Sequence, residues 1–148
     1  MSYKVRLAQD GDIPQIFEMG LEFAKKSQPV HKMVPCEEKI KWLISEGIRK
    51  QDQVWLVLSN DVRLIGFIFG VINEPYFSET LVMQEMAFYV RPTLGLHSLR
   101  LLIAFEKVSK AKGVEAILCG SKPKFCDLKR FYEYRGYDHM EDQFLKML

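Results

Sequence analysis

Three strand-like runs follow one another in the middle of the chain, and a helix-like run comes directly after them. Residues 53–59 (QVWLVLS), 63–72 (RLIGFIFGVI) and 80–90 (TLVMQEMAFYV) are rich in β-branched and aromatic residues, as strands are. Short, turn-rich connections join the three runs, and such connections favour antiparallel neighbours. The helical periodicity after residue 95 instead predicts a crossover helix, which leads to a parallel strand. Together these runs predict one mixed sheet with helices packed against it.

The flanking segments extend this pattern at both ends. Residues 3–8 alternate polar and apolar side chains and predict a first strand. Two amphipathic helices separate it from the central runs, and a strand, a short helix and a closing strand follow the crossover helix. The expected order is β-α-α-β-β-β-α-β-α-β, an α/β (α+β) fold with a mixed sheet of about six strands. The expected bounds of the remaining elements are residues 12–26, 35–48, 114–120, 126–136 and 137–148.

The composition fits one soluble globular domain over residues 1–148. Of the 148 residues, 48% are hydrophobic and 27% are charged, a balance that allows a sizeable core. The formal net charge is only +2, so no global attraction to nucleic acid or to an anionic membrane is expected. The basic run SKPKFCDLKR (residues 121–130) is either a phosphate-contacting surface or a solvated one.

The cysteines and the N-terminal stretch favour a reducing compartment. Cys36, Cys119 and Cys126 are widely spaced and form no CxxC pair, so neither a disulfide framework nor a zinc site is indicated. The three histidines show no metal-ligand spacing, and no metal is expected. The stretch MSYKVRLAQD lacks an apolar signal region, and no apolar run reaches about 18 residues. We therefore expect a cytoplasmic protein that is neither secreted nor membrane-spanning.

Three stretches carry a resemblance to a known family. EMAFYVRP (85–92) is similar to a fourth strand that runs into a cofactor loop, and LLIAFEKVSKAKGVEAILC (101–119) is similar to the helix and fifth strand behind it. RFYEYRGY (130–137) matches an FYxxxGF/Y motif. With the order of elements, these stretches resemble the GNAT superfamily of acetyl-CoA-dependent N-acyltransferases over nearly the whole chain. NEPYFSET and GLHSLRLL also resemble small GNAT-fold proteins encoded by bacteriophages.

The resemblance implies an N-acetyltransferase. Such an enzyme moves an acetyl group from acetyl-CoA to a primary amine by direct transfer in a ternary complex. The acceptor would be a small-molecule or protein amine, with no part for nucleic acid or membrane. Family members often dimerise, so a homodimer is considered for this chain. Family acceptors are diverse, and the sequence does not identify the acceptor.

The resemblance assigns the acetyl-CoA site to two neighbouring stretches. Backbone groups of Phe88, Tyr89 and Val90 would face the amide-rich pantetheine arm, while their side chains serve the core. At the start of the following helix, backbone N–H groups and the helix dipole would bind the diphosphate. Arg100 or a protonated His97 would add positive charge there. The residues assigned to this second stretch are Gly95, Leu96, His97, Ser98, Leu99 and Arg100.

This loop departs from the family pattern Q/R-x-x-G-x-G/A. Leu94 replaces the basic or amide residue, and His97 and Leu99 replace the glycines. These replacements leave the backbone amides in place. Only Gly95 still permits the close approach of a phosphate that glycine allows. The departure raises a second hypothesis, in which the chain is a catalytically inactive GNAT-fold protein that binds a partner. The alternative to a cofactor loop is that this stretch forms an ordinary turn with His97 on the surface.

Two residues are candidates for the proton transfers that acyl transfer to an amine requires. Tyr132 matches the family tyrosine that donates a proton to the departing thiolate, and a phenol with a pKa of about 10 stays protonated at neutral pH. Glu85 occupies a position where some family members carry a general-base glutamate, and it interrupts an apolar strand. The structural alternatives are core packing for Tyr132 and a solvent-facing strand position for Glu85.

Overall fold

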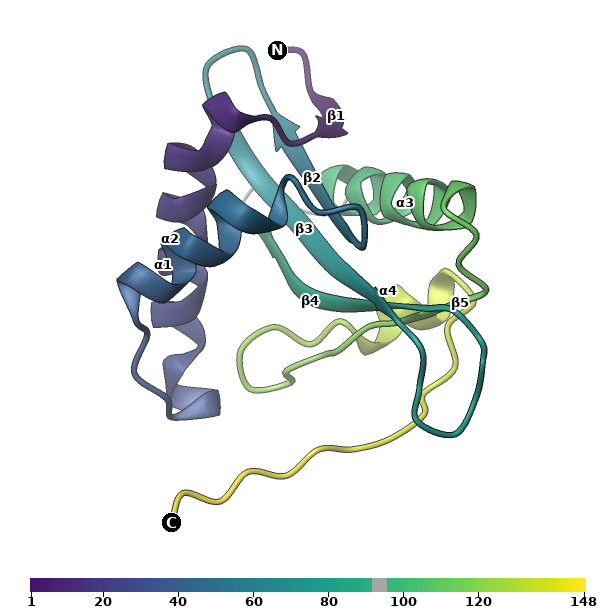
Figure 1. Cartoon of the computed structure of the whole chain (residues 1–148). Helices are drawn as coiled ribbons and strands as arrows, with labels where there is room; N and C mark the ends of the chain where they lie inside the picture. The colour runs from purple at the N-terminus through teal and green to yellow at the C-terminus, as the bar shows by residue number, and fades with distance from the viewer. Residues whose placement is uncertain (92–95) are drawn as a thin grey trace.

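In the part of the chain that the structure describes, five strands form a mixed sheet at the centre of the molecule (Figure 1). The computed structural model describes residues 1–91 and 96–148. Its strands pair in chain order, antiparallel from the first to the fourth and parallel between the fourth and the fifth. The predicted antiparallel strands and the predicted parallel crossover are therefore confirmed. The strands are β1 (Lys4–Leu7), β2 (Gln53–Ser59), β3 (Leu64–Asn73), β4 (Val82–Val90) and β5 (Ala116–Leu118).

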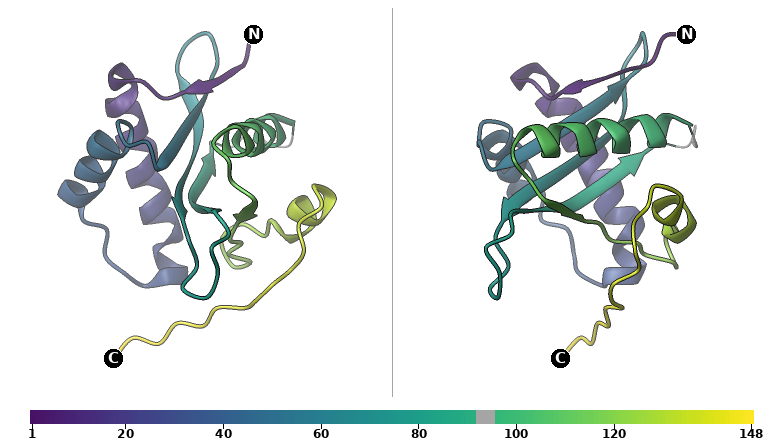
Figure 2. Two further views of the ribbon diagram at one scale, coloured as in Figure 1. Left: turned by 45° about the vertical axis from the view of Figure 1, so that its right-hand side comes forward. Right: turned by 90° about the vertical axis from the view of Figure 1, so that its right-hand side faces the viewer.

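Helices cover both faces of this sheet (Figure 2). They are the 3-10 turn η1 (Asp10–Asp12), α1 (Ile13–His31), α2 (Glu37–Gly47), α3 (Leu96–Ala111) and α4 (Lys129–Tyr134). Because side chains alternate along a strand, Trp55 and Val57 of β2 pack towards α1 and α2, whereas Val54 and Leu56 pack towards α3. None of the helices that the structure describes is long and apolar enough to cross a membrane.

Helix α1 runs further than the sequence predicts. It was expected to end at residue 26, but it continues through Pro29 to His31. The helix ends where Lys32 adopts a left-handed backbone with φ of 61°, and the Lys32 N–H donates to the carbonyl of Gln28. A left-handed residue just past the last turn is a common helix terminator. The termination therefore comes from Lys32, because Pro29 is accommodated within the helix.

A β-bulge interrupts the pairing of β3 with β4. Phe69 lies opposite Ala87, whereas Gly70 lies opposite Glu85, so Met86 is an extra residue in the ladder. A bulge of this kind bends its strand and re-aims the side chains beside it. The Met86 side chain is accordingly exposed, although its strand lies within the sheet.

Gly70 stands opposite the bulge without space for a side chain. A Cβ atom there would lie 2.7 Å from the Phe105 ring and 2.8 Å from both the Gln84 carbonyl oxygen and the Met83 sulfur. We expect Gly70→Ala to lower the free energy of unfolding by about 1–3 kcal/mol, because the surrounding core must shift. Urea denaturation measures this change. Gly11→Ala is the matched control, since no atom lies within 4 Å of its Cβ position. Equal stability of Gly70→Ala and the wild type would contradict the prediction.

Strands β4 and β5 pair over a short distance and then separate. Only Val82 to Gln84 of β4 lie opposite β5. From Glu85 to Val90, β4 has β3 on one side and no strand of the described chain on the other. An unpaired backbone N–H or C=O group is stabilised by a hydrogen-bond partner. The Glu85–Val90 half of β4 is therefore suited to pair with an added peptide-like group.

The closing strand expected over residues 137–148 does not form, and this prediction is wrong. The segment has no regular secondary structure. Residues 139–148, the C-terminal tail, extend away from the body in every view (Figures 1 and 2). A strand needs a neighbour that satisfies its backbone polar groups, and no strand of the described residues pairs with this segment. Within residues 1–91 and 96–148 the sheet therefore has five strands, one fewer than expected.

Candidate active site

Glu85 lies where β4 and β5 separate. Its carboxylate accepts a hydrogen bond of 3.1 Å from the backbone N–H of Gly120, which lies just beyond the end of β5. Met83, two residues earlier in β4, packs on the face covered by α3 and α4. Because alternate residues of a strand share a face, Glu85 lies on that same face. The Gly120 contact thus connects the two strands at the point where their pairing stops.

Burial gives the Glu85 carboxyl an unusual affinity for its proton. Desolvation raises its pKa from the ordinary value of 4.5 to about 7, although the Gly120 N–H and the charge of Lys122 act in the opposite direction. Both protonation states are therefore populated near neutral pH, which suits a group that accepts a proton and later releases it. Glu85 is partly buried rather than solvent-facing.

Tyr132 projects from α4 towards the same region. Its ring is buried and lies against Phe131 and Tyr137, with 5.7 and 5.4 Å between ring centroids. Its buried hydroxyl has no hydrogen-bond partner among the described residues. Burial, and then the charge of Glu85, raise the pKa of Tyr132 above its ordinary value, so the phenol keeps its proton at neutral pH. The fold therefore brings the two candidate proton-transfer residues to one place.

Cys119 and Tyr137 complete this cluster, and neither was assigned a site role from the sequence. Cys119 follows β5 directly and packs in the same apolar cluster as Tyr132 and Tyr137. Burial chiefly, with a contribution from the charge of Glu85, raises the pKa of the Cys119 thiol to about 12. The Tyr137 hydroxyl is also buried and lacks a hydrogen-bond partner within the described chain. The match of Tyr137 to the FYxxxGF/Y motif could have identified this residue from the sequence, whereas no sequence pattern identifies Cys119.

The residues predicted to face pantetheine lie on the open half of β4. Phe88 and Val90 pack in the cluster under α3 and α4. Tyr89 faces α1, where its hydroxyl accepts a hydrogen bond of 2.9 Å from the Lys26 ammonium. The three side chains thus serve the core, as expected. On the β5 side, the backbone of all three has no neighbouring strand in the described part of the chain.

The loop residues predicted to bind the diphosphate lie at the start of α3, except Gly95, which is outside the described residues. His97 is partly buried rather than on the surface, and its ring stacks on Tyr3 with 3.9 Å between centroids. Arg100 is exposed. The first N–H groups of a helix and the positive end of its dipole favour an anion. The residues that the structure describes here are Leu96, His97, Ser98, Leu99 and Arg100.

The basic run at residues 121–130 folds towards α1. Phe125 lies 5.9 Å from the ring of Phe23 on α1, and the Lys122 ammonium lies 5.6 Å from the centre of the same ring. Lys122 and Cys126 pair across a narrow turn. The loop is therefore attached to α1 at one end and, through Gly120, to Glu85 at the other. It forms one rim of the region around Glu85.

No protein-family model and no curated protein matches this chain. Solved structures do match it. The structure of AAC(6')-Iy with a bisubstrate analogue, CoA-S-monomethyl-acetylneamine, has a TM-score of 0.78 at 13% identity and covers 100% of this chain and 99% of that one. An aminoglycoside acetyltransferase from an uncultured soil metagenomic sample, in complex with sisomicin, has a TM-score of 0.70 at 13% identity over 99% and 96%. A GNAT family acetyltransferase from Staphylococcus aureus has a TM-score of 0.70 at 20% identity over 100% of both chains.

These likenesses define the architecture as one shared by acetyltransferases. The chain has the GNAT fold, which confirms the fold expected from the resemblance.

Proposed function

We propose that this protein is an N-acetyltransferase that moves the acetyl group of acetyl-CoA directly to a primary amine within a ternary complex. One observation carries the proposal. Glu85, with a pKa near 7, lies together with Tyr132, whose hydroxyl has no partner in the described chain, at the separation of β4 from β5. Acyl transfer to an amine needs one group that accepts a proton and another that donates one. The solved neighbours, which are acetyltransferases, support the same reaction.

The residues present fit acetyl-CoA. Its pantetheine arm carries amides, and β4 from Glu85 to Val90 offers backbone groups that can bond to them as a neighbouring strand would. The N-terminus of α3 suits the diphosphate because helix N–H groups and the helix dipole favour an anion. Exposed Arg100 would add positive charge. The CoA conjugate bound to AAC(6')-Iy supports a CoA thioester as the acyl donor.

The proton transfers can be assigned to two side chains. Acetyl-CoA supplies an activated thioester; during transfer the amine nitrogen bonds to the acetyl carbon and the carbon–sulfur bond breaks. Glu85 accepts the proton that the amine loses, directly or through a water molecule. The Tyr132 hydroxyl donates a proton to the departing sulfur, and the proton held by Glu85 restores the balance through solvent. The products are the N-acetylated amine and the free thiol of CoA.

The acceptor in this proposal is a small-molecule amine. The sisomicin-bound neighbour is an aminoglycoside acetyltransferase, and this supports a small-molecule acceptor over a protein amine. The rim formed by residues 121–130 and α1, with Phe23, Phe125 and Lys122, is the surface that such an acceptor would meet on its way to Glu85.

Calorimetric titration with acetyl-CoA tests the first requirement of this function. We expect saturable binding with a Kd below about 1 mM, the upper end of common KM values. Acetyl-pantetheine, which lacks both the diphosphate and the adenosine, is the comparison ligand and should bind roughly tenfold more weakly or worse. Absence of any binding heat at millimolar acetyl-CoA would overturn the proposed function.

A non-catalytic binding module with the same fold is the second candidate. Leu94, His97 and Leu99 stand where the family pattern has a basic residue and glycines, and this departure favours it. The module predicts acetyl-CoA binding without transfer to any member of a broad panel of amines. Release of free CoA thiol, followed with a thiol reagent, distinguishes the two candidates. Transfer to any one amine of the panel rules out the module.

A further inference from the structure

Three aromatic rings from separate parts of the chain meet beside α1. Phe23 of α1 is the central ring, and its centroid lies 5.8 Å from that of Tyr89 in β4 and 5.9 Å from that of Phe125. Phe125 belongs to the loop at residues 121–130, which Figure 1 draws in light green, reaching from the end of β5 towards α1. The Tyr89 ring is buried, whereas Phe23 and Phe125 are partly exposed. The rim of the region around Glu85 therefore offers aromatic surface to a small molecule.

Two lysine side chains place their ammonium groups on the same rings. The Lys26 ammonium lies 5.5 Å from the centre of the Tyr89 ring and donates a hydrogen bond of 2.9 Å to its hydroxyl. The Lys122 ammonium lies 5.6 Å from the centre of the Phe23 ring. Among the described residues, no carboxylate forms an ion pair with either lysine. Both positive charges are therefore available to an anionic group of a ligand.

The carboxylates nearby have other partners. Glu22, whose charge acts on Lys26, accepts a hydrogen bond of 3.0 Å from the guanidinium of Arg91. Asp127 is the acidic residue of the loop, and its carboxylate accepts a hydrogen bond of 3.0 Å from the backbone N–H of Lys129. The basic residues of the loop are Lys122, Lys124, Lys129 and Arg130. The rim therefore carries an excess of positive charge.

Lys122 connects this cluster with the candidate active site. Burial raises the pKa of Glu85 to about 7, and the charge of Lys122 acts in the opposite direction, so the ammonium is close enough to affect that carboxyl. The N–H of Gly120, two residues before Lys122, donates to the Glu85 carboxylate directly. An acceptor whose amine reaches Glu85 over this rim would place its other substituents beside Lys122 and the Phe23 ring.

We propose that the acceptor is a primary amine that also carries a carboxylate and an apolar or aromatic group, as an amino acid does, and that polycationic amines are poor acceptors. The inference rests on the proposed acetyl transfer, because it specifies the acceptor of that reaction. The ammonium groups of Lys26 and Lys122 bind the carboxylate, and the rings of Phe23 and Phe125 contact the apolar group. A polycation would instead bring further ammonium groups against the two lysines, and like charges repel. The amine nitrogen receives the acetyl group, and the carboxylate is unchanged.

Steady-state kinetics with matched pairs of amines test the acceptor class. Free phenylalanine and phenethylamine differ only by the carboxylate, and free lysine and cadaverine differ in the same way. We expect kcat/KM to be at least about tenfold higher for the carboxylate-bearing member of each pair, since a charge-assisted hydrogen bond contributes on that scale. Spermidine, a polycation, should be a poorer acceptor than phenethylamine.

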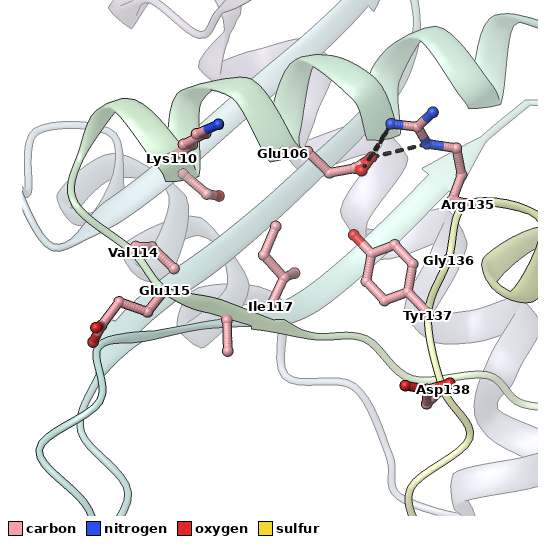
Figure 3. Close-up of a pocket in the computed structure, with 11 residues that line it drawn as sticks. Glu106, Lys110, Val114, Glu115, Ile117, Arg135, Gly136, Tyr137 and Asp138 are labelled. Carbon is pink, nitrogen blue, oxygen red and sulfur yellow. Dashed lines mark hydrogen bonds and ion pairs between the residues drawn. The ribbon is translucent and has the colours of Figure 1, made fainter.

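The double variant Lys26→Met, Lys122→Met separates the effect of the two charges from the intrinsic reactivity of each amine. Methionine keeps an apolar side chain but removes the ammonium group, so the phenylalanine-to-phenethylamine ratio of kcat/KM should fall about tenfold. Lys107→Met, Lys110→Met is the matched control, because it removes two exposed lysines of α3. Figure 3 shows Lys110 at a different pocket, which none of the residues of the aromatic cluster lines. Circular dichroism checks that each variant folds.

Two kinetic results would overturn the inference and leave acetyl transfer itself standing. One is a phenylalanine-to-phenethylamine ratio that is unchanged in the Lys26→Met, Lys122→Met variant. The other is a wild type that acetylates spermidine more efficiently than phenylalanine.

Calorimetry distinguishes failure of this inference from failure of the proposed reaction. Phenylalanine is titrated into the protein with CoA present, so that no acetyl group is transferred. Its affinity should fall about tenfold in the Lys26→Met, Lys122→Met variant and stay within about twofold in the control variant. Carboxylate-dependent binding without transfer in the kinetic assay would support the ligand class and contradict the proposed reaction. Equal affinity for phenylalanine and phenethylamine, or no binding of either, would overturn the inference even for an active enzyme.

Discussion

Replacing Glu85 with glutamine is expected to lower kcat for acetyl transfer by about 10²- to 10⁴-fold, the usual contribution of a general acid or base. Only the ionised carboxylate accepts a proton, and burial holds the pKa of Glu85 at about 7. The wild-type rate should therefore fall roughly tenfold per pH unit below that value, whereas the variant should lack this dependence. Steady-state kinetics over a pH series measure both effects.

Glu115→Gln is the matched control for this substitution. Glu115 also accepts a backbone hydrogen bond of 3.1 Å, from the N–H of Leu81, but it lies on the exposed surface. The control should keep kcat within about twofold of the wild type, because surface substitutions of this kind perturb little. A Glu85→Gln protein with wild-type kcat and an unchanged pH profile would exclude Glu85 as the base.

The same substitution is expected to increase stability at neutral and alkaline pH. Glu85 binds its proton more tightly in the folded state, with a pKa of about 7, than at its ordinary value of 4.5. The wild type therefore loses stability as the pH rises from 4.5 through 7, because the folded state must hold a buried charge. Glutamine stays neutral, so the variant should gain about 1–3 kcal/mol over the wild type across this window. Loss of activity together with lower stability above this window would instead indicate damage to the fold.

Tyr132→Phe is expected to lower kcat by about 10²-fold or more, because the ring stays in the core and only the proton donor is lost. Acetyl-CoA affinity should stay within about twofold of the wild type. The substitution should not reduce stability, since the buried hydroxyl has no partner among the described residues and its removal relieves an unpaired polar group. Single-turnover kinetics, calorimetry and urea denaturation measure the three quantities.

Tyr134→Phe is the matched control for Tyr132→Phe. Tyr134 lies on the same helix and is 79% exposed, so removal of its hydroxyl should leave kcat unchanged. If Tyr132→Phe retained the wild-type kcat, Tyr132 would lose its assignment as the acid, while the proposed reaction would remain to be tested through Glu85.

Local patterns predicted most of the fold. The apolar runs over residues 53–90 and the helical spacing after residue 95 describe neighbours along the chain, and they specified the strand pairings correctly. The prediction of a closing strand was wrong because a strand also needs a neighbouring strand, which no pattern within residues 137–148 specifies. The predicted end of α1 was wrong for a similar reason, since the length of this helix depends on the left-handed conformation of Lys32.

The candidate site was only partly predictable. The resemblance selected Glu85 and Tyr132 one at a time, but their proximity depends on the contact of Glu85 with Gly120 and on the packing of α4, which are tertiary features. The place of Cys119 in the cluster could not be predicted from the sequence, because a cysteine after a short strand has no distinguishing pattern. The roles of the residues at the start of α3 stay predictions.

The bulge in β4 decides which residues of this strand face the side of the sheet on which Glu85 and Tyr132 lie. In a regular strand, every second residue faces the same side. Met83 faces α3, yet Tyr89 faces α1, although both have odd numbers, so the parity of the strand changes at Met86. Glu85 shares a side with Met83 and Tyr132, and the additional residue after it keeps Phe88 and Val90 on that side as well. The number of residues in β4 is therefore constrained as well as their identity, since deletion of the one extra residue would turn Phe88 and Val90 away from the cluster that contains Tyr132, without altering the apolar character of the strand.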